Sequence, residues 1–187
     1  MRKIIVSEFV SLDGIMEDPG GAEKYAHGGW TRAYWSDEIG KIKYDELMAS
    51  DALLLGRVTY EGFAKAWPTA TDTGDFGERM NSLPKVVVSK TLKAVEWKNS
   101  SLIQKNAIEE IAKLKEQPGR DILVEGSSRL VQLLAEHDLV DGYTLLVYPV
   151  TLGEGKRLFG LHSKLQLVET KSVGSGVVLL RYQPDRK

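Results

Sequence analysis

Apolar residues occur along the chain in short runs that alternate with segments of helical periodicity. The runs are rich in β-branched residues, and they predict strands at residues 3–10, 52–55, 85–89, 122–124, 143–147, 165–173 and 177–182. Segments with apolar residues three and four positions apart predict helices after Ser36, Gly56, Asn106 and Gly126. Short strands that alternate with helices predict one α/β domain over residues 1–187, with a mostly parallel central sheet and helices on both of its faces.

The connections between these elements carry further signals. Gly174-Ser175-Gly176 predicts a hairpin between the last two strands, which adds an antiparallel edge to the sheet. Asn106, with Glu109 three residues later, has the pattern of a capping box. Residues 68–77 are expected to form a polar loop, and residues 14–35 form the longest region without clear periodicity, where functional residues often lie.

Charge and composition exclude several classes of function. The chain has 25 basic and 26 acidic residues and a formal charge of -1, so we expect no cationic face for nucleic acid or anionic lipid. It has no cysteine, which excludes disulfides and thiolate metal sites and fits a cytoplasmic protein. Its three histidines are scattered at positions 27, 137 and 162, and we expect no metal site.

Three predicted turns that lead from a strand toward the next segment have the composition of an anion site. They are Gly56-Arg57-Val58-Thr59, Ser89-Lys90-Thr91 and Gly126-Ser127-Ser128. Glycine lets the backbone approach a phosphate, hydroxyl groups add donors, and Arg57 and Lys90 supply positive charge. Each turn taken alone is better explained as a helix cap. Together they favour a dinucleotide site, although the chain lacks the GxGxxG and GxxxxGK[ST] motifs.

Two other residues are candidates for the chemistry. Asp13 ends the first strand, where its carboxylate could donate a proton or bind a polar substrate, or could simply form a turn before Gly14. Trp30 lies in the long loop, and its ring could stack on a flat heterocycle or pack the loop onto the domain. The sequence leaves both pairs of alternatives open.

With these segments in place, the whole chain resembles the dihydrofolate-reductase-like superfamily. It is most similar to stand-alone relatives of the RibD C-terminal reductase domain of riboflavin biosynthesis. The resemblance rests on FVSLDG at 9–14, LLLGRVTYEGF at 53–63, KVVVSKTL at 85–92, ILVEGSSRLVQLL at 122–134 and YPVTLGEGKRLF at 148–159.

The resemblance implies an NADPH-dependent oxidoreductase, cytoplasmic and homodimeric, that reduces a small polar substrate as 5-amino-6-(5-phosphoribosylamino)uracil reductase does. The implied contacts with the cofactor come from the three turns and from three residues outside them. In full, the implied set is Val10, Trp30, Gly56, Arg57, Thr59, Ser89, Lys90, Thr91, Gly126, Ser127, Ser128 and Leu130. For the dimer, Tyr143, Leu145 and Val147 alternate along one strand and could form an apolar contact surface.

Two alternatives to this function remain. Folate reductases place a carboxylate on the first helix after a Trp-x-x-Pro pattern, and here Asp37 or Glu38 could take that place although the pattern is missing. We therefore expect poor dihydrofolate reduction. The second alternative is a protein that binds NADP(H) or another nucleotide without turnover. A riboflavin-pathway role would also need a separate deaminase, because the expected zinc deaminase domain is missing from this sequence.

Overall fold

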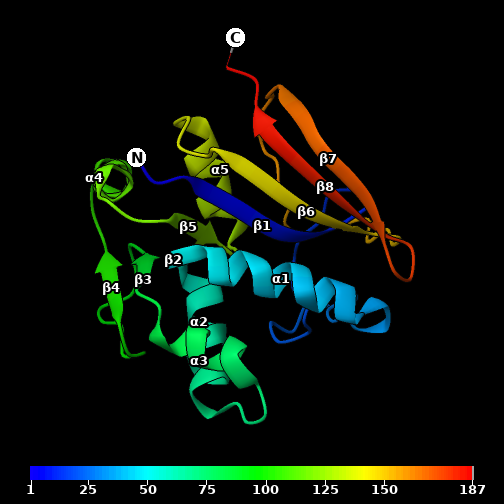
Figure 1. Cartoon of the computed structure of the whole chain (residues 1–187), viewed down its shortest axis with the longest axis horizontal. Coiled ribbons are helices and arrows are strands. Elements are labelled where there is room, and N and C mark those ends of the chain that lie inside the picture. The colour runs from blue at the N-terminus through cyan, green and yellow to red at the C-terminus, as the bar shows by residue number, and fades with distance from the viewer. Residues whose placement is uncertain (187) are drawn as a thin grey trace.

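The apolar run at the start of the chain forms β1 (Ile4–Ser11), which lies inside an eight-stranded sheet (Figure 1). The computed structural model describes residues 1–186. The strand order is β4-β3-β2-β5-β1-β6-β8-β7, and the first six strands in that order run parallel. The other strands are β2 (Ser50–Gly56), β3 (Lys85–Val88), β4 (Ser100–Ile103), β5 (Asp121–Val124), β6 (Gly142–Tyr148), β7 (Leu165–Val173) and β8 (Val177–Pro184).

Helices cover both faces of this sheet. They are α1 (Asp37–Ala49), α2 (Arg57–Ala66), α3 (Gly74–Ser82), α4 (Ala107–Glu116) and α5 (Ser128–Glu136), with 3-10 turns at Arg32–Tyr34 and Trp67–Thr69. In Figure 1, α4 and α5 lie above the strands and α1, α2 and α3 lie below them. The predicted α/β architecture is therefore confirmed, including the closing hairpin, in which β7 and β8 pair antiparallel.

Side chains along each strand point alternately to the two faces of the sheet, so the core has one part under each layer of helices. Val6 of β1 and Val124 of β5 face α4 and α5, where they pack with Ile111 and Leu134. On the other face, residues of β2 and β3 pack against α1, α2 and α3, and residues of β6 and β8 pack against α1. Because the parallel strands are buried on both faces, their sequences are nearly continuous apolar runs.

The structure corrects the sequence prediction in several places. Residues 68–77 are not all loop, because α3 begins at Gly74, and the edge strand β4 had not been expected. Asn106 adopts a left-handed conformation with φ 51°, and its side chain makes no capping hydrogen bond, so the predicted capping box is wrong. In contrast, the Ser36 hydroxyl accepts a hydrogen bond from the Ile39 backbone N–H (3.3 Å) and caps α1 as predicted.

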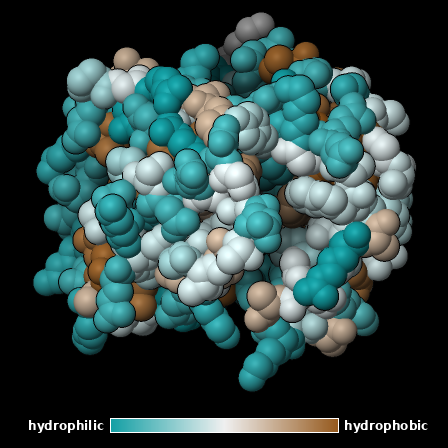
Figure 2. Space-filling model, turned by 60° about the horizontal axis from the view of Figure 1, so that its bottom comes forward, coloured by the Kyte–Doolittle hydropathy of each residue, from teal (hydrophilic) through white to brown (hydrophobic). Residues whose placement is uncertain are grey.

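The apolar stripe on β6 does not form a contact surface. Tyr143 and Leu145 are only 4% and 5% exposed, and they belong to the core under α5. Among residues 1–186, no helix is long and apolar enough to cross a membrane. The face in Figure 2 is mostly hydrophilic, and its hydrophobic atoms form small separate spots, as on a surface that faces water.

Tyr60 provides a test of the packing between α2 and the segment before β4. Its hydroxyl accepts hydrogen bonds from the backbone N–H groups of Glu96 (2.9 Å) and Trp97 (3.0 Å). Tyr60→Phe leaves these donors without an acceptor, and we expect the free energy of unfolding in urea to fall by about 1 to 3 kcal/mol. Tyr44→Phe on the exposed side of α1 (37% exposed) is the control, and it should change that energy by less than about 0.5 kcal/mol. Equal effects of the two substitutions would contradict this role of Tyr60.

Candidate functional site

The turns that follow β2 and β5 meet at one edge of the sheet. These strands are parallel neighbours, so both chains leave the sheet in the same direction. The backbone N–H of Gly56 points to the carbonyl oxygen of Gly126 at 3.5 Å. The N-terminus of α2 at Arg57 and that of α5 at Ser128 therefore open toward the same place, where free backbone N–H groups favour an anion.

Only glycine fits at the contact between these two turns. A Cβ atom on Gly56 would overlap the Ser127 hydroxyl and would lie 3.1 Å from the Ser127 Cβ and 3.2 Å from its backbone nitrogen. Gly126 has φ +68°, and a Cβ atom there would overlap the Thr59 hydroxyl. The result is a turn pair whose walls carry the hydroxyl groups of Thr59 and Ser127 and no large side chain.

The third predicted turn, Ser89–Thr91, follows β3 and so lies at the same edge, because β3 pairs parallel with β2. The Ser89 hydroxyl is occupied within the turn, where it accepts hydrogen bonds from the N–H groups of Thr91 (3.1 Å) and Leu92 (3.0 Å). Lys90 and Thr91 are exposed. Ser89 thus shapes the turn, and Lys90 is free to meet a ligand.

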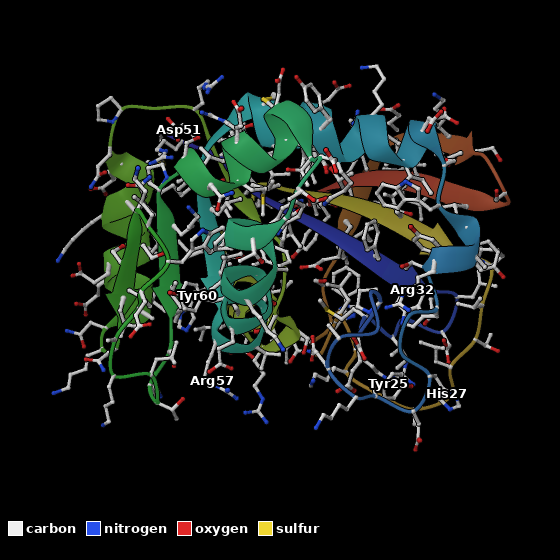
Figure 3. The ribbon with its side chains drawn as sticks, turned by 90° about the horizontal axis from the view of Figure 1, so that it is seen from below. Tyr25, His27, Arg32, Asp51, Arg57 and Tyr60 are labelled. Carbon is white, nitrogen blue, oxygen red and sulfur yellow. The ribbon has the colours of Figure 1, made fainter. Side chains whose placement is uncertain are left out.

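The remaining predicted cofactor residues lie around these turns in different settings. Arg57 is half-exposed and forms an ion pair with Glu61 one helical turn later (2.7 Å). Figure 3 shows Arg57 on α2 and, across the same edge, Tyr25 of the long loop. Val10 and Leu130 are buried in the core, 5% and 4% exposed, so contact with a cofactor would come mainly from their backbone.

Trp30 packs the long loop onto the domain. It is 9% exposed, its ring lies edge-on to that of Tyr148 at 5.4 Å, and its indole N–H donates to the carbonyl of Glu17 (2.8 Å). Further bonds tie the loop to residues 152–158, among them that from the Tyr25 hydroxyl to the carbonyl of Glu154 (2.6 Å). Of the two alternatives for Trp30, the structure shows the one in which its ring packs the loop onto the domain. A role of Trp30 in cofactor binding stays a prediction.

Asp13 lies beside this loop and is held by donors. Its carboxylate accepts hydrogen bonds from the Ser11 hydroxyl (2.6 Å) and from the backbone N–H groups of Leu152 (3.1 Å) and Gly153 (2.7 Å). These donors, with Ser11 the strongest, lower the pKa of Asp13 to about 2. The carboxylate is ionised at neutral pH and holds the β6–β7 connection, so it has no proton to donate in this setting. Its predicted catalytic role stays a prediction.

The two carboxylates at the start of α1 differ in their contacts. Glu38 forms an ion pair with Lys171 of β7 (2.5 Å), which lowers the pKa of Glu38, and Asp37 is exposed. The folate-type role of Asp37 or Glu38 stays a prediction.

Sequence reasoning missed Glu8, the charged residue in the middle of β1. It is 9% exposed, and its carboxyl oxygen accepts a hydrogen bond from the Gly126 backbone N–H (2.6 Å). Burial raises the pKa of Glu8 to about 8, although the Gly126 N–H and Lys43 act in the opposite direction. The signal was present as a glutamate within an otherwise apolar strand, where an ionisable group needs a reason to be buried.

A cavity lies away from these turns. It has a volume of about 700 Å³ and lies between the second half of α5 and residues 158–165. Tyr143, Phe159 and Leu161 contribute to its lining, and none of the predicted site residues does. The chemistry of the turn pair, rather than the size of this cavity, therefore decides where we place the candidate site.

Comparison with known proteins identifies the family of the chain. The family model of the RibD C-terminal domain matches residues 2–179. The uncharacterized protein YyaP of Bacillus subtilis is 30% identical over 97% of this chain and 94% of its own.

Two solved structures share the fold. A protein of Shewanella sp. PV-4 named for riboflavin biosynthesis has a TM-score of 0.77 and 21% identity, with 98% of this chain and 99% of that chain covered. Dihydrofolate reductase from Enterococcus faecalis, in a complex with NADP(H), has a TM-score of 0.61 and 14% identity over 98% of this chain and 96% of that one.

The turn pair makes a prediction about stability. Gly56→Ala adds a Cβ atom against Ser127, whose hydroxyl can rotate away while its Cβ and backbone nitrogen cannot. We expect the free energy of unfolding in urea to fall by about 1 to 3 kcal/mol.

Gly62→Ala is the matched control, because Gly62 lies in α2 and a Cβ atom there would meet nothing within 4 Å. In a helix interior this change should stabilise the protein by about 0.5 to 1 kcal/mol. If Gly56→Ala were as harmless as Gly62→Ala, the two turns would not be in close contact.

Proposed function

Since the chain belongs to the RibD C-terminal domain family, we propose that it is an NADPH-dependent reductase that acts on a small polar substrate. The observation that carries this proposal is the meeting of the β2 and β5 turns at Gly56 and Gly126, with the β3 turn beside them. Two helix N-termini and a lysine then converge where a dinucleotide could place its phosphates.

The residues present fit such a cofactor. The glycines hold the two turns in close contact, with the Thr59 and Ser127 hydroxyls beside them, and a pyrophosphate would bind to the backbone N–H groups at the start of α2 and α5. Lys90 and Thr91, exposed after β3, would meet the adenosine ribose and its 2′-phosphate. When bound, NADPH would supply hydride, while the protein binds and orients it and excludes water.

The substrate is the less defined part of the proposal. A substrate with a ribose 5-phosphate needs cationic partners, and the long loop offers Lys24 and Arg32. Arg32 is occupied, because its guanidinium donates to the carbonyl of Gly20 (2.6 Å). This arrangement supports a small carbonyl or imine compound at least as well as the phosphoribosylamino-pyrimidine of riboflavin synthesis.

A second candidate function is binding of NADP(H) without turnover. The ionised state of Asp13 favours it, because the carboxylate chosen from the sequence cannot supply the proton that must accompany hydride. Oxidation of NADPH with a panel of carbonyl and imine compounds separates the two functions. Tight binding without oxidation of NADPH would support the binding protein.

Cofactor choice is testable by calorimetric titration. We expect NADPH to bind at least about tenfold more tightly than NADH, because Lys90 can make a charge-assisted contact with the 2′-phosphate. Lys90→Ala should lower the affinity for NADPH by about tenfold and leave the affinity for NADH nearly unchanged.

Lys93→Ala is the control for this titration, because Lys93 is an exposed lysine of the same connection and its loss changes the net charge equally. If Lys90→Ala lowered the affinities for NADPH and NADH equally, a contact between Lys90 and the 2′-phosphate would be excluded. No binding of NADPH at millimolar concentration would exclude the reductase itself.

A further inference from the structure

The sheet opens between its two central strands just below the turn pair. β1 and β5 pair only as far as Val6 and Val124, whereas β1 continues to pair with β6 up to Ser11. Glu8 lies on β1 two residues beyond the last β1–β5 pair. Its carboxyl group bridges the opening, because it accepts the hydrogen bond from the Gly126 N–H (2.6 Å). Glu8 therefore holds the first residue of the predicted phosphate turn.

Glu8 shares its surroundings with other buried charges. Lys43 and Glu46 of α1 and Glu125 after β5 act on it. The ammonium of Lys43 lies 2.5 Å from a Glu125 oxygen and 3.5 Å from a Glu46 oxygen, and it donates to the Ser7 hydroxyl (2.7 Å). Two carboxylates thus pair with one ammonium, whose close contacts all go to groups other than Glu8.

The cluster has one hydrogen-bond donor too few. The Glu46 carboxyl is 9% exposed, and its Oε1 is buried without a partner among residues 1–186. An ionised carboxylate only accepts hydrogen bonds, whereas a protonated one also donates. With two other carboxylates nearby and no ammonium of its own, Glu8 is the group that this arrangement favours in the neutral form.

We propose that Glu8 is a positioning residue that fixes the Gly126 turn and takes up a proton when a dinucleotide pyrophosphate binds there. This inference rests on the proposed function, which supplies the anion. An anion at Gly126–Ser128 brings more negative charge close to a carboxylate that Lys43 does not pair. The neutral form of Glu8 then becomes more favourable in the complex than in the free protein.

Linkage gives the sign of the pH dependence. The pKa of Glu8 is about 8 in the free protein and is higher in the complex, so binding consumes a proton above pH 8. Below that pH, Glu8 is already neutral and the affinity for the cofactor does not depend on it. Above it, the affinity falls, by about tenfold for each unit by which the complex raises the pKa.

Calorimetry of the full chain with NADPH tests this inference. Titrations at pH 7.0 and 9.0, each in two buffers with different ionisation enthalpies, measure both the affinity and the protons taken up. We expect the wild-type protein to take up a fraction of a proton at pH 9.0 and to bind more weakly there, by about three- to tenfold. NADH must show the same pH dependence, because it carries the same pyrophosphate without the 2′-phosphate.

Glu8→Gln provides the matched variant, because glutamine is neutral and keeps an acceptor for the Gly126 N–H. It should bind NADPH at pH 9.0 as tightly as the wild type does at pH 7.0, without the proton uptake. Lys85, whose pKa burial lowers to about 8, is retained in both proteins, so its titration cancels in the comparison. Glu116→Gln, at the exposed end of α4, should keep the pH dependence of the wild type.

The outcomes separate this inference from the proposed function. Wild-type protein that binds NADPH at pH 9.0 without proton uptake overturns the role of Glu8, whatever the folding of the variant. A Glu8→Gln protein with the pH dependence of the wild type overturns it as well. Failure of the folded wild type to bind NADPH at either pH instead overturns the proposed reductase, and the inference falls with it.

Discussion

The close approach of the two turns after β2 and β5 is the constraint on which the site depends. It arises because β5 lies between β2 and β1, so that two parallel strands deliver their turns side by side. Gly56 and Gly126 each stand where a Cβ atom would overlap a hydroxyl group of the other turn. Any larger residue at either position would push α2 or α5 away from the edge. The glycines therefore set how closely two helix N-termini can face one ligand.

Electrostatics at this edge is a balance between opposite effects. The N-termini of α2 and α5 favour negative charge, while the buried carboxyl groups of Glu8, Glu46 and Glu125 disfavour it. Burial alone would lower the pKa of Lys43, but these three carboxyl groups outweigh burial and raise it, so the lysine stays charged. One lysine faces three carboxyl groups, and burial raises the pKa of Glu8, the carboxyl group that Lys43 does not contact.

The sequence predicted the parts of this structure that are encoded locally. Apolar runs located β1 and β5, and glycine with hydroxyl residues marked the turns. Helix α3 was not predicted, because its sequence, GDFGERMNS, buries only Gly77 and Met80 and so shows no apolar stripe. Strand β4, with the sequence SSLI, lies at the edge of the sheet and begins with two serines, so it lacks the apolar run that marked β3 and β5. The bond between Glu8 and Gly126 joins residues 118 positions apart, and no local pattern could have indicated it.

Glu8 and Asp13 show how burial decides which carboxyl group can carry a proton. Both lie on or just after β1, and the sequence favoured Asp13 because it ends the strand. Donors from Ser11, Leu152 and Gly153 stabilise the ionised form of Asp13, with a pKa of about 2, while burial stabilises the neutral form of Glu8, with a pKa of about 8. Hydrogen-bond donors and burial thus shift two carboxyl groups near one strand in opposite directions. The charge of Asp13 serves to hold the β6–β7 connection in place.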